Sequence, residues 1–241
     1  MFKRGQVTIF IIFGIVLVLV LFFILNSSRG VVDDVVDDVA YDFDYYLDVC
    51  TENSLKSAIV ELVSTGFVED ELFVFENNEY GFFIKDSNVF FKSKIDLESS
   101  LSNLVNIKLK DCLDNFEHIY ETSNVEINNI DSNITLYSES VFLEVSLNTS
   151  MTVGQTSILK REATSAFSYP LLRYYDLLNE FIEEQRNSEF FLISLLVETL
   201  NQNNINYAIT YAGDNVVLVT LSLPNSVGVF NEDLIMRFAL S

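Results

Sequence analysis

The sequence predicts an α+β protein in which an N-terminal transmembrane helix, extended by an amphipathic helix, carries an ectodomain of mixed antiparallel sheet and helices. Three observations predict this fold class. A long apolar run near the N-terminus contains no charge, and apolar residues recur after it at the spacing of a helix. Short β-like runs then alternate with further helical stretches through the rest of the chain.

The apolar run extends from Val7 to Leu25, and as a helix it spans roughly 28 Å, about the hydrocarbon thickness of a bilayer. Lys3 and Arg4 precede it, and positive charge stays on the cytoplasmic side of a membrane. We therefore expect a cytoplasmic segment or leader at residues 1–5, a transmembrane helix at residues 6–28 and an extracellular remainder. A cleaved secretory signal peptide is the disfavoured alternative, because the run is longer than usual and no A-x-A-like site follows it.

Apolar residues then recur at helical spacing from Val31 to Val63, and Thr65-Gly66 follows as a stop signal. This pattern predicts an amphipathic stalk helix over residues 29–65. Its polar face includes a run of aspartates with no Lys or Arg between them: Asp33, Asp34, Asp37, Asp38, Asp42, Asp44 and Asp48.

Like charges four residues apart on a helix cost a few tenths of a kcal/mol each, so bound cations or a basic partner would offset the repulsion within this run. Asp34, Asp38 and Asp42 are weak candidates for Ca²⁺, since carboxylates suit that ion but no EF-hand spacing is present. A solvated face turned away from an anionic membrane is the simpler interpretation.

Residues 66–241 are expected to form an extracytoplasmic α+β region, as one unit or as two subdomains that divide near residue 120. The predicted strands are Phe67–Phe75, Tyr80–Ile84, Val89–Phe91, Val125–Ile130, Ile134–Tyr137, Val141–Leu147, Thr156–Phe167, Tyr207–Tyr211, Val216–Leu221 and Leu234–Leu240, with turns at residues 131–133 and 148–150. Helices are predicted from Asp96 to Phe116, from Pro170 to about Gln185 and over Phe190–Leu200.

The last two helices carry a wide apolar stripe between Leu171 and Leu200. Core packing is the default interpretation of such a stripe, and a subunit interface in a homo-oligomer is the alternative.

Two cysteines, Cys50 and Cys112, each lie on the apolar face of a predicted helix. Outside the cell a disulfide between them is permitted, and closing a loop of about 60 residues would stabilise the fold by roughly 4 kcal/mol. Two free buried cysteines are the alternative. A zinc site is not expected, because two cysteines and one histidine at distant positions do not form a ligand set.

No motif in the sequence points to catalysis, a cofactor or a metal. His118 is the single histidine, and no G-x-S-x-G nucleophile elbow or phosphate-binding loop is present. The neighbouring carboxylates Glu183-Glu184 and Glu69-Asp70-Glu71 are more typical of a solvated face than of a catalytic pair. The net charge of −21 would repel a phosphate backbone, so nucleic-acid binding is excluded. We therefore predict a protein that is not an enzyme.

Three N-glycosylation sequons begin at Asn26, Asn133 and Asn148. Asn133 and Asn148 fall in predicted turns, where a glycan is tolerated, so these two are the expected sites. Asn26 is not expected to carry a glycan, because it would lie too close to the bilayer.

The first residues, Lys3-Arg4-Gly5-Gln6-Val7-Thr8-Ile9-Phe10, lead directly into the apolar run. They resemble the archaeal class III, type IV pilin-like signal, and the layout as a whole is similar to that of archaeal single-pass surface proteins. The resemblance implies that a prepilin-type peptidase cuts between Gly5 and Gln6. One position departs from it: pilin subunits usually carry Glu at the fifth mature position, where this chain has Phe10. Anchoring and trimming are therefore implied more strongly than polymerisation into a filament.

Together these features predict a membrane-anchored cell-surface structural or interaction protein, either pilin-like or a component of adhesion or assembly, with an acidic ectodomain. Its expected partners are the membrane, further copies of itself or other surface proteins. A tethered ectoenzyme or solute-binding receptor is the main alternative, and a subunit of a membrane complex with obligate partners is the third.

Overall fold

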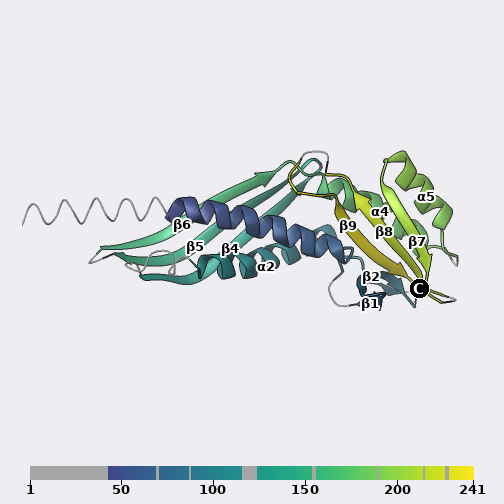
Figure 1. Cartoon of the computed structure of the whole chain (residues 1–241), viewed down its shortest axis with the longest axis horizontal. Coiled ribbons are helices and arrows are strands. Elements are labelled where there is room, and N and C mark those ends of the chain that lie inside the picture. The colour runs from purple at the N-terminus through teal and green to yellow at the C-terminus, as the bar shows by residue number, and fades with distance from the viewer. Residues whose placement is uncertain are drawn as a thin grey trace, which may run out of the picture.

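The computed structural model describes residues 43–68, 71–86, 88–115, 124–153, 156–188, 190–213, 215–225 and 228–241. The chain forms an α+β fold that opens, within these residues, with a helix over residues 43–64 (Figure 1). The elements that follow are β1 (Leu72–Phe75), β2 (Asn78–Lys85), β3 (Asn88–Val89), α2 (Lys94–Leu113), β4 (Asn124–Tyr137), β5 (Ser140–Val153), β6 (Thr156–Phe167), α4 (Leu171–Arg186), α5 (Ile193–Gln202), β7 (Asn206–Tyr211), β8 (Val217–Leu223) and β9 (Leu234–Leu240).

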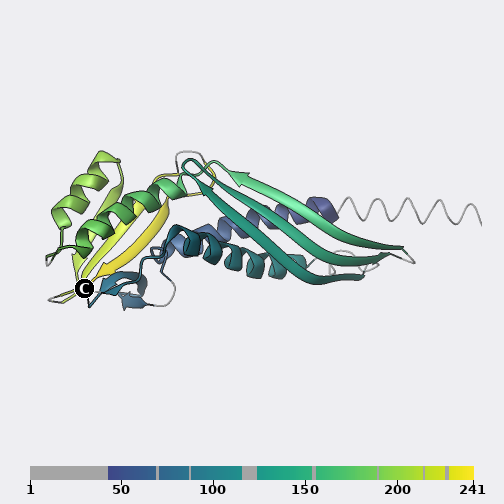
Figure 2. The same ribbon diagram turned by 180° about the vertical axis from the view of Figure 1, so that it is seen from behind.

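One half of the molecule is a long antiparallel sheet in the order β4-β5-β6, with helix 43–64 and α2 lying along it (Figures 1 and 2). Side chains of β5 alternate in burial, so that Leu143, Val145 and Leu147 enter the core between sheet and helices. Two hydrogen bonds join α2 to β4: Ser132 donates to the carbonyl of Ser102, and Glu98 accepts from the amide of Leu136, both at 2.9 Å.

The other half is a mixed sheet in the order β1-β2-β9-β8-β7, with β3 paired to β2. The β2–β9 pair is parallel and the other pairs are antiparallel. Helices α4 and α5 pack beside this sheet, and its strands come from both ends of the described chain (Figure 2). The two sheets lie end to end, so the molecule is elongated, with the start of helix 43–64 and the C-terminus toward opposite ends (Figure 1).

The stop predicted at Thr65-Gly66 is confirmed. The amide of Gly66 donates to the carbonyl of Val63 and that of Phe67 to the carbonyl of Leu62, which caps the last carbonyls of helix 43–64. Gly66 has a φ of +66°, and a Cβ there would lie 2.6 Å from the Phe83 ring. This close approach joins the end of the helix to the second sheet.

Helix α2 starts earlier than the sequence predicts. Ser93 is its N-cap: the Asp96 amide donates to the serine oxygen at 3.2 Å, and the serine hydroxyl donates to the Asp96 carboxylate at 2.6 Å. Asp96 therefore occupies the third helical position, where its negative charge also interacts favourably with the positive end of the helix dipole.

The turns predicted at residues 131–133 and 148–150 are wrong, because β4 and β5 run straight through them. The polar residues that suggested turns alternate between the two faces of the sheet instead. Ser132 points inward and is satisfied by α2, whereas Asn133 and Asn148 are exposed. Register shifts at Ile127/Asn129 and at Leu147/Ser150 absorb the irregularity as bulges, so the strands continue.

Three other boundaries differ from the predicted ones. The first strand begins at Leu72 rather than Phe67, which is fully buried at the end of helix 43–64 with a φ of +66°. Strand β3 ends at Val89. Helix α5 begins at Ile193, because the Gln185 side chain accepts from the amide of Leu192 and donates to the carbonyl of Phe190, which holds this connection out of the helix.

Of the stalk helix predicted over residues 29–65, the part at residues 43–64 is confirmed, and residues 29–42 lie outside the described ranges. Helix α4 and the β7–β8 hairpin match their predictions to within a few residues, and β9 matches its predicted bounds. None of the helices in the described ranges is long and apolar enough to cross a membrane. The predicted transmembrane helix at residues 6–28 lies outside those ranges.

Candidate functional site

The predicted disulfide is present: Cys50 and Cys112 are joined, with their Cα atoms 5.8 Å apart. It ties helix 43–64 to α2 over a sequence separation of 62 residues. Tyr46, one turn before Cys50, donates from its hydroxyl to the carbonyl of Cys112 at 2.9 Å. Further along the same pair of helices, the Lys108 ammonium lies 2.5 Å from the Glu61 carboxylate. The two helices are therefore fastened along most of their shared length.

The same helix is also held by the sheet. The Arg161 guanidinium on β6 lies 3.2 Å from the carboxylate of Asp44, and the Lys56 ammonium lies 5.3 Å from the centre of the Phe167 ring. These contacts come from residues more than 100 positions apart, so no local pattern in the sequence could have indicated them. The side chains Phe43, Leu47 and Cys50 complete the attachment by entering the common core.

An aromatic cluster joins this half to the mixed sheet. Phe83 on β2 stacks on Phe238 of β9 with ring centres 4.0 Å apart, and it also contacts Phe91 at 4.9 Å. Tyr175 of α4 stacks on Phe91 at 5.0 Å, and Phe67 approaches both of these rings at 6.1 Å. The cluster therefore links the segment that follows helix 43–64 to strands β2 and β9 and to helix α4.

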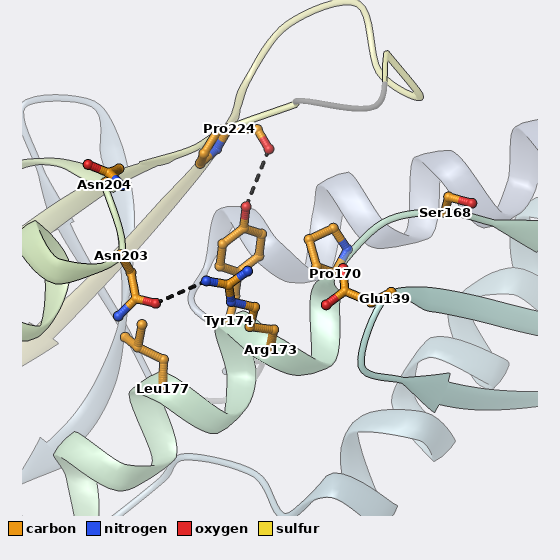
Figure 3. Close-up of a pocket in the computed structure, with 9 residues that line it drawn as sticks. All are labelled: Glu139, Ser168, Pro170, Arg173, Tyr174, Leu177, Asn203, Asn204 and Pro224. Atoms are coloured by element: carbon orange, nitrogen blue, oxygen red, sulfur yellow. Dashed lines mark hydrogen bonds between the residues drawn. The ribbon is translucent and has the colours of Figure 1, made fainter.

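A pocket of about 420 Å³ opens where the two halves meet (Figure 3). Its lining comes from four separate segments: Glu139, Ser168, Pro170, Arg173, Tyr174, Leu177, Asn203, Asn204 and Pro224. The Arg173 guanidinium donates to the Asn203 side chain at 3.3 Å, and the Tyr174 hydroxyl donates to the Pro224 carbonyl at 3.4 Å. Sequence reasoning missed this pocket because its residues are distant in the chain and form no motif.

The chemistry of this pocket suits binding better than catalysis. Burial raises the pKa of Tyr174, so its hydroxyl stays protonated at neutral pH and acts as a donor rather than a base. Arg173 and Glu139 supply one charge of each sign, and the asparagines supply amide donors and acceptors. Ser168 and Glu139 both line the pocket, but within the described residues no hydrogen bond joins the serine hydroxyl to the carboxylate, as activation of a nucleophile by a base requires.

Carboxylates gather in a second groove, of about 480 Å³, between α4 and α5. Asp176, Glu180 and Glu184 line it at intervals of four residues along α4. Glu183 is exposed and does not line the groove, so the predicted Glu183-Glu184 pair is divided between two surfaces. Where the chain is described, no three His, Cys, Asp or Glu side chains are placed to hold a metal ion.

The remaining candidate residues fall in different places. Glu71 forms an ion pair with Lys85 at 2.9 Å, and its neighbours Glu69 and Asp70 lie outside the described residues. His118 and the cleavage candidates Gly5 and Gln6 also lie outside them, as do the Ca²⁺ candidates Asp34, Asp38 and Asp42.

Asn133 and Asn148 do not lie in turns, as predicted, but both are exposed on neighbouring strands. Asn133 pairs with Glu144, and Asn148 pairs with Asn129, on the face of the β4–β5 pair that is turned away from the buried side chains. Glycosylation at either residue stays a prediction.

The apolar stripe of Leu171–Leu200 belongs mainly to the core. Leu178, Phe181 and Ile182 of α4 and Leu196 and Leu200 of α5 are all buried. The default interpretation of this stripe is confirmed.

Replacing Tyr169 with Phe is expected to stabilise the protein by about 1 kcal/mol at neutral pH. The Tyr169 side chain is fully buried against Phe230 and Tyr174, and its hydroxyl has no hydrogen-bond partner in the described structure. Urea unfolding of the wild-type and Tyr169→Phe proteins measures the difference. A variant less stable than the wild type would contradict the account of an unsatisfied hydroxyl.

The same residue predicts a pH dependence. Burial raises the pKa of the Tyr169 hydroxyl far above its usual range. The unfolded chain loses this proton above about pH 10 whereas the folded chain keeps it, so the contribution to stability is full below pH 10 and falls as the pH rises further. The Tyr169→Phe variant should therefore lose stability less steeply above pH 10, as measured by urea unfolding across that range.

Comparisons with known proteins provide no further guide to the site. No family model matches the chain, and neither a curated protein nor a solved structure is significantly similar to it.

Proposed function

We propose that this protein is a membrane-anchored structural or interaction protein of the cell surface, pilin-like in its layout, with an acidic extracellular domain. The observation that carries the proposal is the attachment of helix 43–64. In the sequence this helix follows the apolar run of Val7–Leu25, and in the structure it is fastened to the domain by the Cys50–Cys112 disulfide, by ion pairs and by its buried face.

Such an attachment suits a structural role. A domain that needs only to be kept near a membrane can be joined to its anchor by a flexible linker, such as one rich in Gly and Ser. Here residues 43–64 form a helix that is part of the core, so a force or rotation that reaches residue 43 is passed to the domain without a hinge at residues 43–64. The molecule is elongated along the direction of helix 43–64 (Figure 1).

The net charge of −21 supports an extracellular position for the domain. A strongly acidic surface stays soluble, and it is repelled by anionic lipid headgroups, so the domain would stand away from the bilayer rather than lie on it. Positive charge at Lys3 and Arg4 favours a cytoplasmic N-terminus.

Alkaline extraction of membranes tests the anchor. The full chain is expected to stay in the membrane pellet, and a Val16→Asp/Val20→Asp variant is expected to be released, because each charge at the centre of a span costs about 3 kcal/mol. The matched control is Val49→Asp/Val60→Asp, which makes the same change at exposed positions of helix 43–64. Release of the wild-type chain would contradict the proposal.

Intact-mass measurement of the protein purified from its native membrane tests processing. We expect the loss of residues 1–5 and a mass lower than that of the reduced chain by two hydrogen atoms, since the disulfide is formed. A chain that keeps its leader would contradict the pilin-like part of the proposal, while a glycan at Asn133 or Asn148 would appear as an added mass.

The pocket in Figure 3 favours a second candidate function, the binding of a small polar solute by an anchored receptor. Its volume of about 420 Å³ and the exposed Arg173 suit an anionic or polyhydroxylated molecule. A thermal-shift screen of sugar acids tests this function. Stabilisation that is lost in Arg173→Ala and kept in the surface control Arg186→Ala would support it, and no stabilisation by any of them would exclude it for this class of solute.

A further inference from the structure

Strand β7 is an edge of the mixed sheet, and among the described strands it pairs with β8 alone. The amide of Ala212 donates to the carbonyl of Val216 at 2.9 Å, so these facing residues form a hydrogen-bonded pair at the end of the hairpin. Such pairs alternate along an antiparallel ladder, and Tyr207, Ile209 and Tyr211 therefore turn their backbone N–H and C=O groups away from β8. None of the described residues forms a hydrogen bond with these outward groups.

The other edge strands carry the features that keep a sheet edge from pairing with another chain, namely short length, charged side chains and bulges. Strand β1 has only four residues and lies between two glutamates, and β4 contains Asp131 and a bulge. Strand β6 contains the charged residues 160–162. Strand β7 differs from all of these. It contains no charge and no proline, and its register with β8 is regular.

The open edge of β7 is complementary to itself. In an antiparallel pair, two facing residues of the hydrogen-bonded type exchange both of their N–H···O=C bonds. A two-fold axis at Ile209 places this residue opposite its own copy and places Tyr207 opposite Tyr211, so every outward group of β7 finds a partner. Any other register leaves one of the three outward residues of each strand beyond the end of the other strand.

The side chains of β7 suit the same register. Tyr207, Ile209 and Tyr211 share one face of the strand, where the first two are half-buried against the core and Tyr211 is 68% exposed. In the pair, the Tyr211 ring of each copy lies beside Tyr207 of the other copy, which is a favourable cross-strand contact. On the opposite face the exposed and small Ala208 and Thr210 stand opposite each other, so no bulky side chains collide there.

Charge restricts where two copies can approach each other. Each chain has a net charge of −21, so two copies repel over most of their surface. Residues 199–213, which include β7, contain no Asp, Glu, Lys or Arg. A contact through this uncharged strip avoids placing carboxylates of the two copies opposite each other, a juxtaposition that disfavours association.

We propose that two copies of this chain associate by antiparallel pairing of their β7 strands about a two-fold axis at Ile209. The mixed sheets of the two copies then continue into each other, as in other cases of strand addition at a sheet edge. An edge of six residues makes a small interface, so single molecules pair weakly. Pairing becomes strong where many anchored copies face one another, because the contacts then act together.

The shape of the molecule sets the direction of this contact. The two-fold axis of an antiparallel edge pair is perpendicular to the sheet. In Figure 1 the broad face of β9 is toward the viewer, the long axis is horizontal, and β7 lies toward the end away from the start of helix 43–64. A half-turn about that axis therefore points the helices 43–64 of the two copies in opposite directions. The inference rests on the proposed function here: copies that are anchored ahead of this helix pair across facing membranes, as in adhesion between cells.

Paired cysteines test the register in the full chain. Ala208 of one copy faces Thr210 of the other with Cα atoms about 4.5 Å apart, a distance that a disulfide spans. One population of cells carries Ala208→Cys and another carries Thr210→Cys, and the two are pelleted together under mild oxidation. We expect about tenfold more disulfide-linked dimer than in either population pelleted alone, because identical positions are diagonal neighbours about 7–8 Å apart. Cys50 and Cys112 are already joined and do not compete.

A change of charge tests the uncharged strip. Tyr211→Asp, added to both cysteine variants, should lower the yield of dimer about tenfold, because it brings a carboxylate of each copy into the contact and removes the aromatic pair. Tyr137→Asp is the matched control: Tyr137 is 54% exposed at the end of β4, in the other sheet, and the yield should not change. Thermal melts of both variants check that the domain stays folded.

The outcomes separate this inference from the proposed function. The absence of dimer in the mixed pellet, dimer only when one cell makes both variants, equal yields from either variant alone, or an unchanged yield in Tyr211→Asp would each overturn it. None of these results bears on alkaline extraction of membranes, which tests the anchor. If extraction released the wild-type chain, the proposed function and the pairing across facing membranes would both fail, and mixing the two purified cysteine variants would still test the pairing of β7.

Discussion

Removing the disulfide by Cys50→Ala/Cys112→Ala is expected to lower the free energy of unfolding by about 4 kcal/mol. The bond closes a loop of 62 residues, so without it the unfolded chain gains conformational freedom that the folded chain does not. Cys50 is fully buried, and the loss of its sulfur also leaves a small gap between helix 43–64 and α2. Equilibrium unfolding in urea measures the change.

The reduced wild-type protein is the control for this prediction. It keeps both sulfur atoms in place, so its loss of stability reports the cross-link alone, and the difference from the double variant reports the packing. We expect most of the loss of about 4 kcal/mol both in the reduced wild-type protein and in the double variant. A reduced protein within 1 kcal/mol of the oxidised one would mean that the helix pair is held by its other contacts, such as Tyr46 with Cys112 and Lys108 with Glu61.

Replacing Phe83 with Ala is expected to cost about 4 kcal/mol, the typical loss for a fully buried phenylalanine. The Phe83 ring is fully buried, stacks on Phe238 and contacts Phe91, so its removal opens a cavity where β2, β9 and the end of helix 43–64 meet. In Phe83→Ala, native-state hydrogen exchange should also rise more at the Gly66 and Phe67 amides than at the Cys50 amide, because the Phe83 ring lies against Gly66.

Phe190→Ala is the matched control, because the Phe190 ring is 78% exposed and only its backbone amide and carbonyl are used in hydrogen bonds. Its cost should stay within about 0.5 kcal/mol. If Phe83→Ala cost no more than Phe190→Ala, the aromatic cluster would not be the joint between the two halves of the molecule.

Where a signal is local, the sequence was sufficient to predict the structure. The end of helix 43–64 follows from Gly66, the start of α4 follows from Pro170, and the bounds of β9 follow from an isolated apolar run. The pairing of Cys50 with Cys112 was predictable because each cysteine lies on an apolar helix face, and only two cysteines are present.

Other features depend on contacts between distant residues and were not predictable. The polar runs at residues 131–133 and 148–150 resemble turns, and only the neighbouring strand and the carbonyl of Ser102 explain why they stay extended. The pairing of Arg161 with Asp44 and the hydrogen bond from Arg173 to Asn203 in the pocket also follow from the fold rather than from neighbours in sequence.

The position of the domain relative to the membrane is tested most directly by a protease of narrow specificity added to intact cells. Its recognition sequence is inserted after Gly213, in the connection between β7 and β8, where an added side chain meets open space. A cytoplasmic protein of the same cells that carries the same sequence is the control. The account predicts cleavage near Gly213 in intact cells and cleavage of the control only after the cells are broken. Protection at Gly213 until the cells are broken would contradict it.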